Sequence, residues 1–326
     1  MAAERLIALE SRSEWEAALD AVPHMFGHTW GSAHAQSLAT GYRTFLYEAR
    51  DDCARAICPL VERPVDGRCD VATPFGFSGL TANRHWPGLG DRLAGLARRR
   101  RYVSGYITVN PLFADESYAD PKELWLTNYT YTLDLTQGLQ TLHRLLDRNR
   151  RRQLRAWRPD LHESDPEPLK AFFLEEYPRF MARKEAVSYY RLSPRSLAAI
   201  CELPTVFLLG APARGPLEAV SVFGYTPHAA DALFNASLPG GERHSTPLLW
   251  SAIQRLVELS VPALNLGGGL RPGDSLAQYK QRFGARRRPM YAMKQVYDPA
   301  AYAELCRRTG REPATRDGFF PAYRSP

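Results

Sequence analysis

The chain has 326 residues, about the length of two domains of roughly 150 to 160 residues each. Hydrophobic residues make up 44% and charged residues 24%, which excludes a disordered chain, and no apolar run approaches the roughly 18 residues that span a bilayer. The N-terminal residues lack the apolar core of a secretory signal, and the five cysteines are scattered without a CxxC pair. We therefore expect a cytoplasmic protein with no disulfide framework and no metal site.

Arginine supplies most of the positive charge. Lys and Arg number 42 against 35 Asp and Glu, giving a net charge of +7, and only five of the 42 are lysines. The arginines are concentrated in three blocks, at 98–101, 148–158 and 282–288. Such blocks bind polyanions, for which the arginine fork is well suited, or remain as solvated faces. A GC-rich genome would explain the excess of arginine equally well.

The first half of the chain is predicted to contain several strands followed by a helix. Strand-like runs cover 44–49, 54–62, 106–110 and 129–135, and the last of these alternates apolar and polar residues at period two. A helix is predicted from about Gln137, with its leucines at helical spacing, and Pro159 ends it after the arginine block.

The second half alternates helices and strands again. Helices are predicted over 167–181 and after Ser193-Pro194, which is typical of an N-cap followed by proline. Strands are predicted over 205–209, 217–224 and 232–238. Ser245-Thr246-Pro247 is a second cap-and-proline start, and it leads into a helix with a buried stripe of leucine, isoleucine and alanine.

The last part of the chain is predicted to hold a short strand and two helices. The strand covers 263–266 and runs into the glycines 267–269, for which a tight turn is the simplest explanation. A short helix follows from Asp274 to a stop at Gly284, and a tail helix runs from Asp298 to near Gly310.

Several familiar catalytic patterns are absent from the sequence. It contains no GxxxxGK[ST] loop, no HExxH, no GxSxG elbow and no GxGxxG after a strand. Hydrolysis by a metal, by an activated serine or by a phosphate-binding loop is therefore unsupported, and we expect neither a metal ion nor a resident cofactor.

One stretch carries the most information, Asn265 to Tyr291, with the sequence NLGGGLRPGDSLAQYKQRFGARRRPMY. A strand, a glycine turn and a short helix that bears an aromatic-Lys pair and ends on Arg-Phe-Gly resemble the signature of the Fem family of peptidyltransferases, which have tandem GNAT-like domains. The segment from Tyr177 to Tyr190 resembles the opening of that family's second domain. Thr246 to Ile253 resembles the helix between these two motifs, and Arg148 to Arg151 resembles the end of the first domain.

The resemblance implies two GNAT-like α/β domains, each a mixed central sheet flanked by helices. We expect them at 1–160 and 161–298, with a helical tail at 299–326. It also implies acyl transfer to an amine, with an aminoacyl-tRNA as the donor in the best-studied branch. Because an aminoacyl ester is already activated, such an enzyme needs placement of a neutral amine and stabilisation of the oxyanion more than a covalent nucleophile.

The resemblance also implies roles for individual residues. Lys280 is the candidate for stabilising the oxyanion, or for holding the terminal ribose and phosphate of the donor, and Tyr279 precedes it where the family commonly has phenylalanine. The candidates for acceptor and substrate binding are Arg183, Tyr189, Tyr190, His244 and Asp274. For Asp274 a helix cap is an alternative role, and for Tyr279 a place in the core. The candidates for tRNA binding are Arg150, Arg151, Arg152, Arg282, Arg286 and Arg287.

One departure weakens coenzyme A as the donor. GNAT domains that bind acetyl-CoA carry an R/Q-x-x-G-x-G/A loop whose amides hold the pyrophosphate, and the corresponding loop at 239–245 lacks that order. No counterpart is present of the coiled-coil arm that some cell-wall members insert, which favours a small soluble acceptor. The sequence therefore predicts an aminoacyl-tRNA-dependent aminoacyltransferase acting on a small peptide-like amine. An acyl-CoA N-acyltransferase and a non-catalytic RNA- or polyanion-binding protein are the alternatives.

Overall fold

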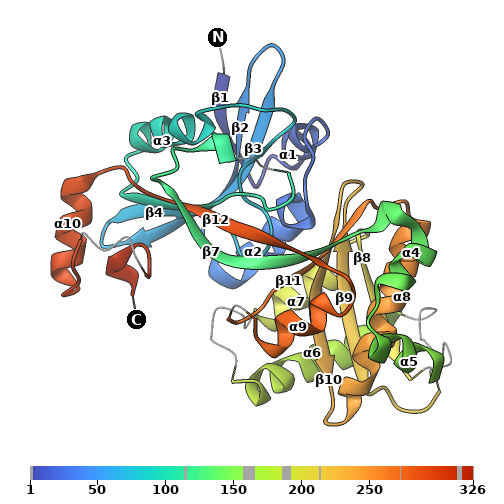
Figure 1. Ribbon diagram of the computed structural model, residues 1–326. Coiled ribbons are helices and arrows are strands. Elements are labelled where there is room, and N and C mark those ends of the chain that lie inside the picture. Colours follow the sequence, from blue (N-terminus) through green and yellow to red (C-terminus); the bar gives the residue numbers. More distant parts are fainter. Residues whose placement is uncertain are drawn as a thin grey trace. The chain divides into compact units, whose positions relative to one another are not determined.

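The computed structural model describes residues 3–113, 116–156, 166–185, 192–212, 214–271, 273–313 and 318–325. The chain forms two compact units (Figure 1): unit 1 comprises Met1–Asn128 and Pro289–Pro326, and unit 2 comprises Tyr129–Arg288. This division differs from the limits expected from the sequence, 1–160 and 161–298. Two long strands, β7 (Leu124–Asp134) and β12 (Arg286–Val296), each have one part in each unit, so the chain returns to unit 1 before it ends.

Unit 1 is built on a mixed sheet. Its strands β1 (Ala3–Ala8), β2 (Thr44–Arg50), β3 (Arg55–Val65) and β4 (Arg68–Ala72) pair antiparallel in order. Strand β6 (Ser104–Thr108) pairs parallel to β4 and antiparallel to β12, and the short β5 (Thr81–Ala82) pairs with β3.

Helices cover both faces of this sheet because side chains alternate along each strand. On one face Leu46 and Ile57 pack in a buried cluster with α1 (Arg12–Leu19). On the other, Tyr47 and Cys58 pack with α3 (Leu89–Arg99). The remaining helices of unit 1 are α2 (Trp30–Thr40) and α10 (Pro299–Arg308), the latter being the tail helix expected from the sequence.

Unit 2 has a second mixed sheet, in the order β7, β11 (Ala263–Gly268), β10 (Ala230–Ser237), β9 (Ala219–Tyr225) and β8 (Val206–Ala211). Only the β10–β11 pair is parallel. Helices α6 (Pro166–Arg183) and α7 (Pro194–Cys201) pack on one face. Helices α4 (Gly138–Leu145), α5 (Arg148–Ala156), α8 (Ser245–Glu258) and α9 (Ser275–Gln281) belong to the other.

The two units repeat one arrangement. Each contains three antiparallel strands, then a helix, then a strand that pairs parallel to the third of the three: β2-β3-β4, α3 and β6 in unit 1, and β8-β9-β10, α8 and β11 in unit 2. The parallel pairing spans only two residue pairs in each unit. The fold class expected from the sequence, a tandem pair of mixed sheets flanked by helices, is confirmed.

The helix predicted from Gln137 is in fact two helices, α4 and α5. The chain bends at Leu146, whose ψ of 142° is extended. Asp147 then starts α5, since its carboxylate accepts a hydrogen bond from the Arg150 N–H at 2.7 Å. The prediction at Ser245 was also imprecise, because the position before α8 is His244 and the Ser245 hydroxyl donates instead to the Glu242 carbonyl.

None of the helices among the described residues combines the length and the hydropathy needed to cross a bilayer.

Candidate functional site

The parallel strands β10 and β11 separate after two residue pairs and leave a fork in the sheet of unit 2. Ala230 pairs with Leu264 and Asp231 with Asn265, after which β10 continues to Ser237 and β11 to Gly268. Among the residues that the structure describes, no segment pairs with the facing edges beyond these pairs. Ligands of α/β proteins bind outside the carboxyl ends of parallel strands, so this fork is the candidate site.

The equivalent fork of unit 1, between β4 and β6, is filled by the chain itself. The Leu80 N–H donates to the Thr108 carbonyl at 2.9 Å, and the Leu80 carbonyl accepts from the Asn110 N–H at 3.1 Å. The Asn110 side-chain amide donates to the Ser78 carbonyl at 2.8 Å. These backbone groups at the fork of unit 1 are therefore already paired within the chain, so the fork of unit 2 is taken as the candidate site.

Lys280 brings a buried cation to the end of β11. It lies on α9 with only 7% of its surface exposed, and its ammonium donates a hydrogen bond to the carbonyl of Gly268, the last residue of the strand. Burial lowers the pKa of Lys280 to about 8, although the nearby Asp274 carboxylate acts in the opposite direction. An ammonium has three N–H donors, so two remain for a ligand or water beside the one given to Gly268.

Asp274 builds the turn that places α9. Its carboxylate accepts from the Ala277 N–H at 2.7 Å, which caps the helix, and from the N–H groups of Leu270 at 2.7 Å and Arg271 at 3.0 Å. Burial by itself would raise the pKa of Asp274, but these backbone donors and Lys280 outweigh it and lower the pKa. A Cβ on Gly269 would lie 2.6 Å from the Asp274 Oδ1, so the turn requires glycine there. The predicted helix cap is confirmed, whereas Gly267 and Gly268 belong to β11 and the turn follows from Gly269.

We expect the Asp274→Ala substitution to lower the free energy of unfolding by about 1–2 kcal/mol, the upper range for loss of a helix cap. Because the folded-state pKa of Asp274 is lowered, its contribution is present above the ordinary aspartate pKa and is lost as the pH falls through the folded value. Urea unfolding of wild type and variant at pH 7 and in acid measures this. Equal losses of stability at both pH values would contradict it.

Tyr279 holds α9 against the first turn of α8. Its hydroxyl donates to the Ser245 carbonyl at 3.0 Å, and burial raises the pKa of the phenol. The phenol therefore stays protonated at neutral pH with its proton committed to a backbone carbonyl. The catalytic role expected of Tyr279 stays a prediction, and the structure shows its hydroxyl proton engaged by the Ser245 carbonyl.

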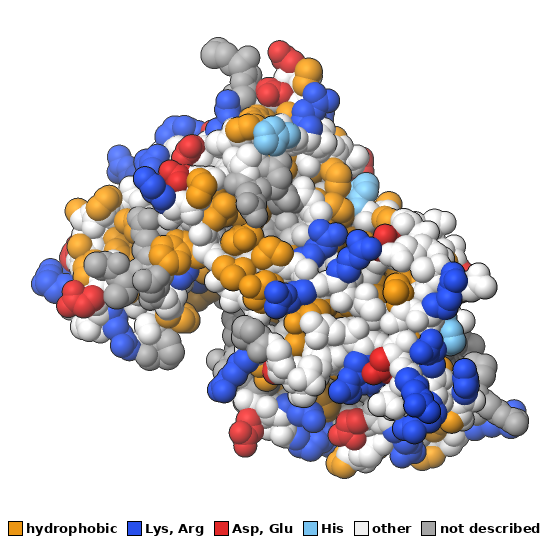
Figure 2. Space-filling model, in the orientation of Figure 1, with side chains coloured by type: hydrophobic (Ala, Val, Ile, Leu, Met, Phe, Trp, Pro, Cys, Tyr) orange, Lys and Arg blue, Asp and Glu red, His pale blue; other side chains and the backbone are white. Residues whose placement is uncertain are grey.

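Helix α5 presents two different faces. Arg148, Arg151, Arg152 and Arg155 have the i, i+3, i+4, i+7 spacing of one helix face and, with Asn149, line a cavity of about 760 Å³. We call these four residues the arginine stripe. Among the described residues, none of the four has an ion-pair partner. Figure 2 shows Lys and Arg side chains gathered where Figure 1 places α5.

Arg150 points to the opposite side of α5, toward α8 and α9. Its Nη1 donates to Thr246 Oγ1 at 2.7 Å, and its guanidinium lies 4.5 Å from the centre of the Tyr279 ring. Arg150 is expected to bind tRNA together with Arg151 and Arg152, and that role stays a prediction; the structure shows its side chain partly buried against α8 and α9, beside the helix that carries Lys280. The sequence signal for this is its spacing to Leu154, four residues later on the same helix, which packs against the core of unit 2.

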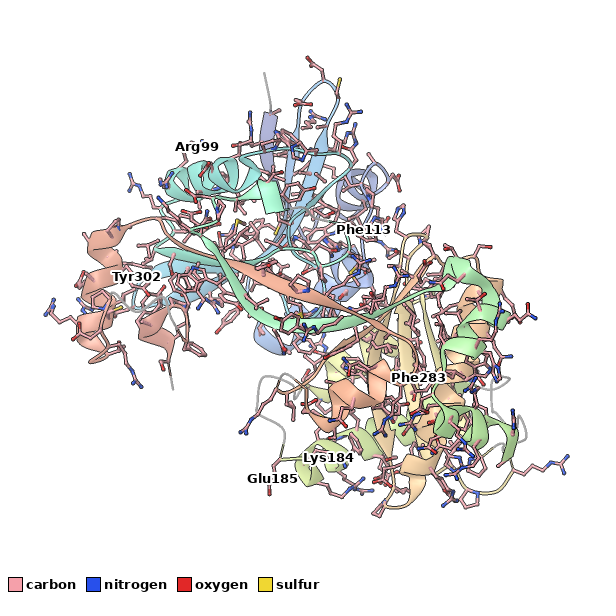
Figure 3. The ribbon with its side chains drawn as sticks, in the orientation of Figure 1. Arg99, Phe113, Lys184, Glu185, Phe283 and Tyr302 are labelled. Carbon is pink, nitrogen blue, oxygen red and sulfur yellow. The ribbon has the colours of Figure 1, made fainter. Side chains whose placement is uncertain are left out.

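Arg183 lies at the end of β10, the other arm of the fork. Its guanidinium donates to the carbonyl of Ser237, the last residue of that strand, and lies 3.8 Å from Glu176. Lys184 and Glu185 follow it at the C-terminal end of α6 (Figure 3). Arg183 and Lys280 thus contact the last residues of the two strands that form the fork. Tyr189 and Tyr190, the other candidates for acceptor binding in this segment, lie outside the described residues.

The remaining candidate residues lie before α8, after α9 and on β12. His244, 6% exposed, precedes α8, and its Nε2 lies 3.0 Å from Glu218 Oε2, a partner that the sequence did not indicate. Arg282 follows α9, with its Nε 3.7 Å from the Asp147 carboxylate. Arg286 and Arg287 are exposed on β12, where the Arg287 guanidinium lies 4.3 Å from the centre of the Tyr129 ring.

Comparison with known proteins identifies the fold. No family model matches the sequence, and no curated protein matches it. Among solved structures, FemX aligns over 93% of this chain and 99% of its own, with a TM-score of 0.67 and 12% identity. A conserved protein of unknown function from Bacteroides thetaiotaomicron aligns over 91% and 100%, with a TM-score of 0.59 and 12% identity. The chain therefore has the tandem GNAT-like fold of FemX, as the sequence predicted.

Proposed function

We propose that this protein is an aminoacyltransferase that takes an aminoacyl group from an aminoacyl-tRNA and forms an amide bond on the amine of a small peptide-like acceptor. The observation that carries the proposal is the buried Lys280 ammonium at the open end of the β10–β11 fork. Burying an ammonium against a neutral carbonyl costs free energy. That cost is explained if the ammonium stabilises a negative charge that forms on the substrate during the reaction.

In the reaction, the amine nitrogen of the acceptor attacks the carbonyl carbon of the aminoacyl ester. The C–N bond forms, the carbonyl oxygen becomes an oxyanion, and the Lys280 N–H groups that Gly268 does not use can donate to it. The C–O bond to the terminal ribose of the tRNA then breaks. The amine loses one proton and the departing ribose oxygen gains one, so the step needs no oxidant, metal or other co-reactant.

The arginine stripe supports a polyanionic donor. Its four guanidinium groups share one helix face and have no carboxylate partner among the described residues, which favours binding to phosphates. Helix α5 also contacts α8, so the stripe belongs to the same unit as Lys280. A coenzyme A donor has less support, because Pro247 in the first turn of α8 has no N–H to offer a pyrophosphate.

On the acceptor side, Arg183 is the candidate for binding an anionic group, because it reaches the end of β10 from α6 and keeps 38% of its side chain exposed. The resemblance of residues 265–291 to the signature of the Fem family of peptidyltransferases supports amide formation as the reaction type. An acyl-CoA N-acyltransferase on the same fold is the second candidate, and a non-catalytic RNA-binding protein is the third.

Transfer of radiolabel distinguishes the three. The purified protein is incubated with tRNA charged with a mixture of labelled amino acids and with short peptides that have free amines, and in parallel with labelled acetyl-CoA. We expect label in the peptides from the charged tRNA only, and tighter filter retention of charged than of uncharged tRNA. Label from acetyl-CoA alone would replace the proposal by the second candidate. Retention of both tRNAs without transfer from either donor would favour the third.

A further inference from the structure

Arg150 connects three helices around the site through well-defined contacts. Its Nη1 donates to Thr246 Oγ1 on α8 at 2.7 Å and to Gln153 Oε1 on α5 itself at 2.8 Å. Its guanidinium also lies 4.5 Å from the ring centre of Tyr279 on α9 and 5.7 Å from that of Phe283, which follows α9 and is labelled in Figure 3. The same side chain thus touches the first turn of α8 and the aromatic side of α9.

Helix α9 depends on such contacts for its position. It has only seven residues, which is too short for a helix to be stable without tertiary packing. Apart from the Asp274 turn at its start, it is held by the Tyr279 hydroxyl on Ser245 and by the packing of its aromatic rings. Lys280 directly follows Tyr279, so a displacement of α9 that follows from loss of the Tyr279 contacts also moves the base of the Lys280 side chain.

We propose that Arg150 is a positioning residue, which holds the aromatic side of α9 against α8 and thereby fixes the Lys280 ammonium at the end of β11. The assignment rests on the proposed function for its catalytic consequence, but its structural part can be tested without any substrate. The two faces of α5 then have different roles. The arginine stripe faces outward and binds the donor, and Arg150 faces α9, the helix that carries Lys280.

The first test measures the titration of Lys280 directly. The amines of the substrate-free protein are labelled with trace acetic anhydride between pH 6 and 11, and the peptide that contains Lys280 is quantified by mass spectrometry. With only five lysines in the chain, the Lys280 peptide is readily resolved. In wild type we expect a midpoint near 8. In Arg150→Gln we expect it to move toward the ordinary lysine value of about 10.4, because a displaced α9 exposes the ammonium.

The matched control is Arg255→Gln. Arg255 on α8 also lies over an aromatic ring, with its guanidinium 4.5 Å from the centre of the Phe207 ring, but it contacts no residue of α9 in the described contacts. Its loss removes the same type of contact and the same charge from the same unit. We expect its Lys280 titration to match wild type. A midpoint that moves equally in both variants would overturn the proposal, as would an unchanged midpoint in Arg150→Gln.

The second test separates position from charge. Arg150→Lys keeps the positive charge but loses the planar fork that reaches Thr246 and Gln153 together. In aminoacyl transfer we expect kcat to fall about tenfold or more in Arg150→Gln, with the KM for the donor within about twofold of wild type. Recovery in Arg150→Lys should be partial. Wild-type kcat in Arg150→Lys would mean that charge alone matters and would overturn the positioning role.

Two further outcomes are distinguishable. A shifted Lys280 titration in a protein that shows no aminoacyl transfer would leave the positioning role intact and count against the proposed function alone. If Arg150→Gln does not fold, Gln153→Leu provides the test, since Gln153 is exposed and its loss removes one of the two acceptors of Arg150 Nη1. We expect a smaller shift in the same direction, and no shift would overturn the proposal.

Discussion

Lys280→Ala should lower kcat for aminoacyl transfer by about 10² to 10³, with the KM for the donor close to wild type. This is the loss typical of removing one donor that meets an oxyanion, because such a donor acts in the transition state and contributes little to substrate binding. Lys280→Arg should recover only part of the rate, since a planar fork does not place its charge where a compact ammonium does. Steady-state transfer with charged tRNA and with acyl-CoA gives both parameters.

The pH dependence provides a second signature of Lys280. The protonated amine stabilises an oxyanion much better than the neutral amine because it carries a positive charge, and burial lowers the pKa of Lys280 to about 8. The rate of wild type should therefore fall as the pH rises through about 8, and Lys280→Ala should lack that decrease. Lys122→Ala, at an exposed position in unit 1, is the control and should keep the wild-type profile.

Stability should change in the opposite direction from activity. Because the folded-state pKa of Lys280 is below the ordinary value, the charged form is penalised at pH 7, and wild-type stability should increase between about pH 8 and about 10.4. Replacement of Lys280 by leucine should therefore keep or raise the midpoint of urea unfolding at pH 7 while activity is lost.

The kinetics of Lys280→Ala separate the two roles considered for this residue. If KM for the donor rises while kcat is unchanged, Lys280 holds the donor rather than the oxyanion. Unchanged kinetics with both donors would remove Lys280 from the site.

The second large effect is expected for donor binding by the arginine stripe. When Arg148, Arg151, Arg152 and Arg155 are all replaced by glutamine, affinity for charged tRNA should fall about 100-fold at low salt. The slope of log K against log salt should become shallower by roughly 3 to 4, because each neutralised phosphate releases counterions. Filter binding between about 50 and 200 mM salt measures both the affinity for charged tRNA and the slope.

The control for the stripe removes the same charge elsewhere. Four arginines that are exposed and lie outside the three arginine blocks are replaced by glutamine, namely Arg12, Arg50, Arg195 and Arg307. If net charge alone drives binding, the two fourfold variants should behave alike, and if the stripe variant keeps both the wild-type affinity and the wild-type slope, a GC-rich genome is enough to explain the arginines. The stripe is supported only if its variant loses both affinity and salt dependence and the control keeps them. Arg150 is left unchanged in both, because its side chain contacts α8 and α9.

Much of the candidate site could be predicted from local sequence signals. Asp274 caps α9 and Gly284 ends it, with a φ of +81° that favours glycine, as capping preferences indicate. The aromatic-Lys pair at Tyr279 and Lys280 marked the site through its resemblance to a family motif. These features depend on residues within a few positions of one another, and such residues determine turns and helix ends largely by themselves.

The sequence by itself determined the mixed α/β class, most strands and helices of unit 2, and the position of Lys280 beside a glycine turn. Only the tertiary structure decided which face of α5 meets the core, because an arginine can bury its stem and stack on a ring as readily as it can stay in solvent. It also decided that β7 and β12 run through both units, that Leu80 occupies the fork of unit 1, and that no segment among the described residues occupies the fork of unit 2 in this way. Pairing between strands far apart in the chain depends on packing that no local pattern records, and that pairing makes unit 2 the candidate catalytic unit.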